Sequence, residues 1–254
     1  MSLRLSNKQM LYQERTYRTF QHYNRLKKFR VVVKETDLFV SADRDLQKET
    51  EEEVIQCRMP LENYIRLYPE FLTILTPFPD DRLAHPIVQD MICAGKAAKV
   101  GPMAAVAGAV AERVGRSLLN YSQQVIIENG GDIFIKSNHS VTVGILAGDS
   151  PLSNKIGLEI DPKKMPISVC TSSGTVGHSL SLGKADAVTV VARSAALADA
   201  AATAIGNTVK DKGSIYKGLA LANSINGVLG VLIVLGDKLG VKGDLKLIPL
   251  GGTT

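Results

Sequence analysis

Apolar residues in the second half of the chain alternate with polar ones in short runs, which is the period of β-strands. The predicted strands of this half are 125–127, 133–135, 141–145, 156–160, 167–169 and 187–192, followed by a hairpin that pairs 228–235 with 245–248. The N-terminal part predicts strands at 16–23, 29–33 and 38–40. Helical spacing predicts helices at 45–59, continuing after Pro60 over 61–68, and at 86–99, 103–119, 192–207 and 216–221.

Strands and helices come in blocks, without β-α-β alternation and without a GxGxxG turn. This order predicts an α+β fold with mixed or antiparallel sheets and packed helices, and it argues against a Rossmann domain. Four prolines between residues 68 and 86 mark the best candidate boundary between subregions. We therefore expect a basic hairpin and helix region at 1–85 and a core at 86–254, joined in one integrated domain.

The helix at 192–207 is the most informative stretch. Ser194 is a suitable N-cap, and Gly206 with Asn207 is expected to end the helix in a left-handed residue. Between these signals every side chain except Asp199 and Thr203 is Ala, Leu or Ile, so the helix should be buried.

Asp199 and Thr203 are four positions apart, which places a carboxylate and a hydroxyl on one face of that helix. A buried carboxylate needs a partner, and oxygen ligands of this kind suit a hard divalent cation such as Mg²⁺. The alternative is a carboxylate satisfied by backbone amides or by a distant Arg, with Thr203 bonding back to the preceding turn. Both interpretations stay open at this point.

Two glycine-bearing turns carry the other candidate chemistry. The turn at 128–132 contains Asn129-Gly130, a common type I′ hairpin pair, but its glycines also let backbone amides approach a phosphate. The loop at 170–178 offers hydroxyls, glycines and His178, which is the candidate general base. A serine hydrolase site is disfavoured because no GxSxG turn is present, and Cys170 is expected in the core.

A second glycine-bearing helix lies earlier in the chain, at 103–119. Gly108 and its small neighbours there suit close packing against a sheet or a ligand, with core packing favoured. His85, just before Pro86, is expected to start the preceding helix and not to bind a ligand.

Charge and cysteine usage narrow the class of protein. Residues 1–34 hold nine Lys or Arg against one acid, interleaved with aromatic residues. This pattern fits either a nucleic-acid surface or a basic edge hairpin, and we favour the hairpin because no nucleic-acid-binding motif accompanies it. Three scattered cysteines argue against a disulfide scaffold or a zinc site, and no apolar run is long enough to cross a bilayer. A cytoplasmic protein without a membrane segment is expected.

Taken in order, these stretches resemble the flavin-transferase (ApbE) superfamily, and more closely its short ApbE-related branch. Asn129-Gly-Gly-Asp132 resembles the family's asparagine-glycine-glycine turn, and Thr171-Ser172 followed by Gly174 resembles its threonine-serine-glycine loop. Ala198-Asp-Ala-Ala-Ala-Thr203 is similar to its alanine-aspartate-(three residues)-threonine helix, and it follows a matching Val-Thr-Val-Val strand. The resemblance covers about residues 95 to 235.

The resemblance implies an α+β fold that binds FAD with Mg²⁺, an activity that transfers FMN to a threonine of an acceptor protein, and a small-molecule nucleotide as ligand. Asp199 and Thr203 would hold the metal together with a backbone carbonyl. The residues that would line the flavin nucleotide are Asn129, Gly130, Gly131, Asp132, Thr171, Ser172, Ser173 and Gly174, with Gly101 as a looser match.

The sequence departs from the family pattern after the second loop. Family transferases carry a histidine followed by an isoleucine-aspartate-proline segment, whereas this chain reads His178-Ser-Leu-Ser-Leu-Gly in a shortened loop. We also expect no lipoprotein signal of the kind that many bacterial relatives carry. The alternative function is a non-transferase, ligand-binding accessory protein, and the resemblance to short related proteins of anaerobes implies a link to sulfide assimilation.

Overall fold

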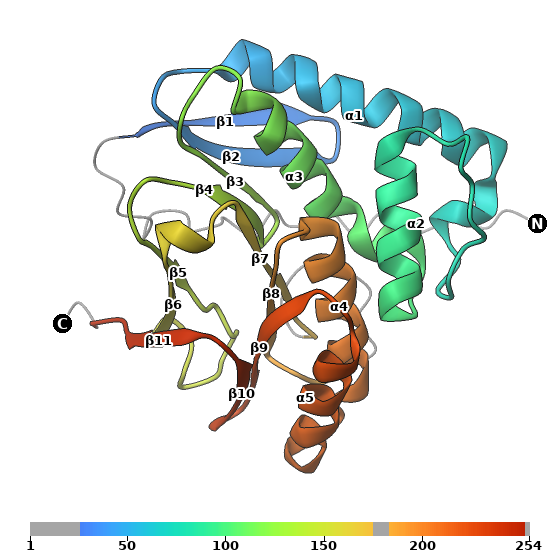
Figure 1. The fold of residues 1–254 in the computed structure, drawn as a ribbon. Coiled ribbons are helices and arrows are strands. Elements are labelled where there is room, and N and C mark those ends of the chain that lie inside the picture. Colours follow the sequence, from blue (N-terminus) through green and yellow to red (C-terminus); the bar gives the residue numbers. More distant parts are fainter. Residues whose placement is uncertain (1–25, 175–182, 252–254) are drawn as a thin grey trace, which may run out of the picture.

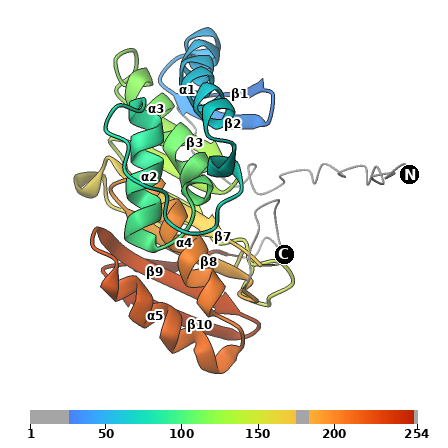
Figure 2. The ribbon, with the colours of Figure 1, turned by 90° about the vertical axis from the view of Figure 1, so that its right-hand side faces the viewer.

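The computed structural model describes residues 26–174 and 183–251. A large antiparallel sheet forms the centre, helices cover one face and a small three-stranded sheet covers the other (Figure 1). The turned view shows α2, α4 and α5 on the helical side of the large sheet (Figure 2). The predicted α+β class with antiparallel sheets and packed helices is confirmed. The strand predicted at 16–23 lies outside the described residues.

Eight strands make the large sheet, and neighbouring strands pair antiparallel. Their spatial order is β1 (Lys27–Val33), β2 (Thr36–Ala42), β3 (Val125–Asn129), β4 (Asp132–Lys136), β7 (Ile167–Ser172), β8 (Ala187–Ala192), β9 (Val228–Leu235) and β10 (Lys238–Gly243). The small sheet has the order β11 (Lys246–Pro249), β6 (Ile156–Ile160) and β5 (Val141–Gly144). Alternate side chains of the large sheet therefore enter two different cores, one under the helices and one between the sheets.

The helices are α1 (Gln47–Leu67), α2 (Pro86–Ala98), α3 (Val106–Leu118), α4 (Ala195–Thr208) and α5 (Ile215–Ser224). Pro60 lies inside α1, which continues across it as expected. Helix α4 packs on β7 and β8, and it also contacts α2 and α3. Within the described residues no helix combines the length and the apolar character that crossing a bilayer requires.

The predicted C-terminal hairpin is wrong in its second strand. β9 turns at Gly236, which has a φ of 59°, and pairs with β10. Residues 246–249 instead form β11, which pairs with β6 in the small sheet. β10 was missed by the sequence analysis because its sequence, Lys-Leu-Gly-Val-Lys-Gly, carries lysines and glycines on an edge strand that is mostly exposed.

The predicted end of α4 is also corrected. Gly206 stays helical and buried, and the helix runs on to Thr208, whose Oγ1 donates a 2.7 Å hydrogen bond to the Ile205 carbonyl. A Cβ on Gly183 would lie 1.9 Å from the Gly206 carbonyl oxygen. Neither Gly206 nor Asn207 adopts a positive φ, and the helix is followed by Val209 with a φ of −90°, so the predicted left-handed end is wrong.

Candidate functional site

Helix α4 carries Asp199 and Thr203 on a face that is only partly covered. The helix begins at Ser194, whose side chain accepts a hydrogen bond from the Leu197 amide at 3.3 Å. The alanines around Asp199 and Thr203 are buried against β7, β8 and α2, whereas these two residues keep partial exposure. The predicted pairing of the carboxylate and the hydroxyl on one face is therefore realised, next to the start of α3.

Asp199 supplies the N-terminal cap of α3 from another helix. Ala105, which precedes α3, has no side-chain acceptor, and the Gly108 amide donates to Oδ2 of Asp199 at 2.9 Å. Gly108 is the third residue of α3, the position whose amide an N-cap side chain normally satisfies. The interpretation of Asp199 as bound to backbone amides is thus correct. No Lys or Arg forms an ion pair with Asp199 in the described parts of the chain.

The carboxyl group of Asp199 is hard to ionise in this position. Burial raises its pKa from 3.8 to about 7, although the amides of Gly108 and Ala107 favour the ionised form and offset part of the effect. The protonated form of Asp199 is therefore far more favoured near neutral pH than for an ordinary Asp. A positive charge beside it would lower the pKa and keep the carboxylate ionised.

The β3–β4 turn brings Asn129 and Asp132 to the same helix-facing side of the sheet. Gly130 and Gly131 are its central residues, with φ of 67° and 108°, so Gly-Gly and not Asn-Gly forms the two-residue turn. The Asn129 Nδ2 donates to the Ala107 carbonyl at 3.0 Å, which ties the turn to α3.

Asp132 is a buried acid without a full set of partners. It is 6% exposed, and its Oδ1 is buried without a hydrogen bond in the structure. Burial, followed by the charge of Asp199, raises its pKa well above the usual range. Buried Asp132 and partly exposed Asp199 thus influence each other at the junction of β4 and α4, a position where a cation would be stabilised.

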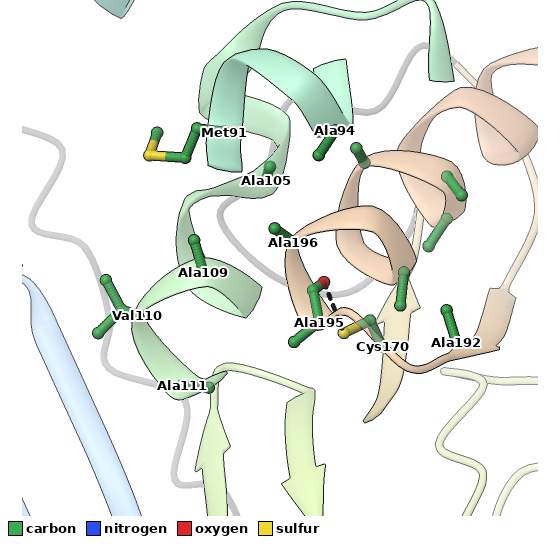
Figure 3. Packing of buried hydrophobic residues seen from close by; sticks show 14 of the residues in the cluster. Met91, Ala94, Ala105, Ala109, Val110, Ala111, Cys170, Ala192, Ala195 and Ala196 are labelled. Carbon is green, nitrogen blue, oxygen red and sulfur yellow. Dashed lines mark hydrogen bonds between the residues drawn. The ribbon is translucent and has the colours of Figure 1, made fainter. Parts of the chain in front are cut away.

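The end of β7 contributes fewer side chains to the candidate site than the sequence analysis predicted. Cys170 faces the helices and its Sγ donates to the Ala195 carbonyl at 3.5 Å, so it is a core residue as expected (Figure 3). The next side chain, Thr171, points to the opposite face of the sheet, where its Oγ1 lies 2.9 Å from that of Thr189. The Thr171 hydroxyl is therefore directed away from Asp199, and only its backbone remains available to the helix-facing side.

The rest of this loop follows the strand's alternation. Ser172 returns to the helix-facing side, and Ser172 and Ser173 are both partly exposed. The Gly174 amide bonds to the Ala185 carbonyl at 2.9 Å, which closes the base of the loop. His178, the predicted general base, lies outside the described residues.

Two other predicted residues have packing roles. Gly101 is buried, and a Cβ there would lie 1.8 Å from the Ile74 carbonyl oxygen, so contact with the backbone of residues 74 and 75 accounts for this glycine. His85 caps α2 by accepting the Ile87 amide through Nδ1 at 3.4 Å, as its position before Pro86 indicated.

The sequence interpretation missed Glu112. This residue lies on α3, and its Oε2 accepts the Ala195 amide at the start of α4 at 2.6 Å. The available signal was a single acid at the end of the alanine-rich run 103–111, four residues after Gly108. Gly108 was recognised only as a site of close packing, and the structure adds its bond to Asp199.

The oxygen donors on this face of α4 are too few to bind a hard cation alone, so a bound nucleotide or water would have to supply further oxygens. Among the described residues no group of three or more His, Cys, Asp or Glu side chains is arranged around one metal position. Asp199 and Thr203 offer oxygen donors, and the unpaired Oδ1 of Asp132 adds negative potential nearby. A divalent ion here would complete its shell with backbone, water or phosphate oxygens.

A cavity of about 240 Å³ lies elsewhere, between the two sheets. Its walls include Ile167 and Val191 from the large sheet and Leu158 from the small one, all part of the core on the far side from Asp199. Its charged rim is partly neutralised by the Lys164–Asp244 and Lys246–Glu159 ion pairs. This hollow is therefore separate from the candidate site.

Comparison with solved structures defines the class of fold. A flavin transferase ApbE from Vibrio cholerae is similar over 85% of this chain and 97% of that chain, with a TM-score of 0.56 and 12% identity. The apo form of a flavinyl transferase ApbE from Pseudomonas stutzeri is similar over 85% and 94%, with a TM-score of 0.56 and 14% identity. The chain thus has the ApbE fold.

Sequence comparison gives the family. A family model described as AbpE bacteria matches residues 19–236, and the chain belongs to this ApbE-like family. A UPF0280 protein of Methanocaldococcus jannaschii is 42% identical over 224 residues, which cover 86% of this chain and 91% of that protein. The resemblance inferred from the turn, loop and helix motifs is confirmed at the level of the family.

Proposed function

We propose that this protein binds FAD together with a divalent cation, Mg²⁺, and acts on the pyrophosphate of the nucleotide. The observation that carries the proposal is the pair of neighbouring carboxyl groups, buried Asp132 and partly exposed Asp199, which have no basic partner among the described residues. The fold shared with proteins named flavin transferases supports a flavin nucleotide as the ligand.

The chain's own residues have distinct roles in this proposal. Asp199 has two oxygens, and because Oδ2 is held by the Gly108 amide, Oδ1 is the oxygen we assign to the cation, next to the Thr203 hydroxyl. The glycines and amides of the Asn129 turn line the nucleotide. A divalent ion at this position would supply a Lewis acid that polarises a phosphoryl oxygen. His178 remains the candidate base on the sequence alone.

Binding is tested by titrating FAD into the protein by calorimetry, with Mg²⁺ and with EDTA. We expect Mg²⁺-dependent binding in the wild type that Asp199→Asn and Thr203→Val each weaken at least about tenfold, the equivalent of ~1.4 kcal/mol. Asn preserves an acceptor for the Gly108 amide, and Val preserves the shape of Thr, so the helices should stay in place.

Asp237→Asn is the matched control, because Asp237 lies in the exposed β9–β10 turn and pairs with Lys212. It should bind FAD like the wild type. Absence of FAD binding by the wild type, or equal affinities in all four proteins, would contradict the proposed function.

Transfer is a separate question from binding. Transfer would join the FMN phosphate to a threonine hydroxyl of an acceptor protein and release AMP. Incubation with FAD, Mg²⁺ and a threonine-bearing acceptor distinguishes three outcomes by mass spectrometry. Covalent FMN on the acceptor supports a transferase, and free FMN with AMP supports pyrophosphate cleavage. Binding without either product favours the accessory role, which the altered sequence after His178 also favours.

A further inference from the structure

Helices α3 and α4 cap each other: a carboxylate on each helix accepts a hydrogen bond from a backbone amide near the N-terminus of the other. Asp199 on α4 accepts the Gly108 amide of α3 at 2.9 Å, and Glu112 on α3 accepts the Ala195 amide of α4 at 2.6 Å. The two residues of each helix are four positions apart, so each helix presents one amide and one carboxylate on the same face. Each helix therefore satisfies an amide that its partner cannot pair internally.

The two backbones touch at this point. A Cβ on Gly108 would lie 2.3 Å from the Ala195 carbonyl oxygen and 2.9 Å from the Asp199 Cβ. Alanines line both sides of the contact, among them Ala109 and Ala196 (Figure 3). Because no long side chain separates the helices, a small shift of α4 would displace Asp199 by a similar amount.

Glu112 is itself firmly oriented. Arg116 binds Oε1 through Nε at 2.8 Å and through its Nη2 at 2.7 Å, which leaves Oε2 for the Ala195 amide. The side chain is 14% exposed, so the carboxylate is mostly removed from water. Arg116 also lies over the Phe134 ring, 5.7 Å from its centroid, and this contact fixes the guanidinium against the sheet.

We propose that Glu112 is a positioning residue, which holds the first turn of α4 against α3 and so sets the orientation of the Asp199 carboxylate and the Thr203 hydroxyl. Its link to metal affinity rests on the proposed function, whereas its link to the Gly108–Asp199 bond does not. Glu112 touches neither the cation nor the nucleotide in this scheme, and it acts through the helix it caps.

The test uses the full chain with three variants, Glu112→Ala, Glu112→Gln and Arg116→Ala. Gln keeps an oxygen that can accept the Ala195 amide, and Arg116→Ala removes the exposed pairing while leaving the Glu112 carboxylate. Two quantities are measured well below the unfolding temperature. One is the NMR shift and hydrogen exchange of the Gly108 amide in metal-free protein, and the other is Mn²⁺ affinity by electron paramagnetic resonance.

Glu112→Ala should move the Gly108 amide resonance, speed its exchange and weaken Mn²⁺ binding by about tenfold, the scale on which the loss of a helix cap acts. The Mn²⁺ affinities of Glu112→Gln and Arg116→Ala should stay within about threefold of the wild-type affinity. A tenfold change in affinity corresponds to ~1.4 kcal/mol. An unchanged Gly108 amide in Glu112→Ala overturns the proposal whether or not metal binds.

An altered Gly108 amide with unaltered Mn²⁺ affinity would also overturn it, because Glu112 would then act on the fold alone. A wild type that binds no Mn²⁺ while its Gly108 amide responds to Glu112→Ala would refute the proposed function and leave the positioning of Asp199 supported. The two failures are therefore distinguishable.

Discussion

Replacing Asp199 with Asn should make the metal-free protein more stable at alkaline pH. The folded state raises the pKa of Asp199 from 3.8 to about 7, mainly through burial. Between these pH values the folded protein binds more protons than the unfolded chain, so the free energy of unfolding falls as pH rises. Asn does not titrate, and its amide oxygen still accepts the Gly108 amide, so the variant should lose this pH dependence.

The size of the effect follows from the pKa difference. At 1.36 kcal/mol per pKa unit, the step from 3.8 to about 7 corresponds to at most about 4 kcal/mol, lost between roughly pH 4 and pH 7. Exchanging a charged acceptor for a neutral one costs about 1 kcal/mol in the variant. The variant should therefore be more stable than the wild type by about 2 to 3 kcal/mol at pH 8, on the same order-of-magnitude scale.

The assay is urea unfolding followed by circular dichroism from pH 5 to pH 8.5 in EDTA, because the chain has no tryptophan to report by fluorescence. Asp132 titrates together with Asp199, so the variant should keep a residual slope from the remaining acid. Added Mg²⁺ should stabilise the wild type by about 2.7 kcal/mol at a hundred times its dissociation constant, and Asp199→Asn by at least about 1.3 kcal/mol less. Identical pH profiles of the two proteins in EDTA would refute the reasoning.

Two further predictions concern the helix contact and the thiols. Gly108→Ala should lower the free energy of unfolding by about 1 to 3 kcal/mol, because its Cβ would meet the Ala195 carbonyl oxygen at 2.3 Å. Urea unfolding measures this change, and an unchanged free energy of unfolding would contradict the tight contact. Iodoacetamide at pH 8 should modify exposed Cys93 and leave Cys170 intact, because burial raises the Cys170 pKa well above its usual value. Mass spectrometry of the labelled native protein measures this, and equal labelling of the two thiols would show that Cys170 is accessible.

The sequence was sufficient to predict an element where only local signals determine it. Ser194 and the apolar run after it predicted α4 almost to the residue, because an N-cap and a helical apolar pattern are local properties. The partner of Asp199 was out of reach, since the Gly108 amide is 91 positions away and becomes its neighbour only through packing of α3 on α4. The orientation of Thr171 was within reach, because a strand that buries Cys170 under the helices must turn the next side chain to the other face.

The cap and the cation are compatible roles for Asp199, and the cap makes the second role easier. A carboxylate bound to the Gly108 amide through Oδ2 is already oriented before any ligand arrives, so a cation need not reorder the helix. The same burial that raises its pKa to about 7 makes the ionised form costly without a positive charge. A site with fixed geometry and an uncompensated charge gains most from a cation that arrives with phosphate oxygens to complete its shell. This combination, and not either feature alone, is the physical argument for the proposed nucleotide-linked metal at the start of α3.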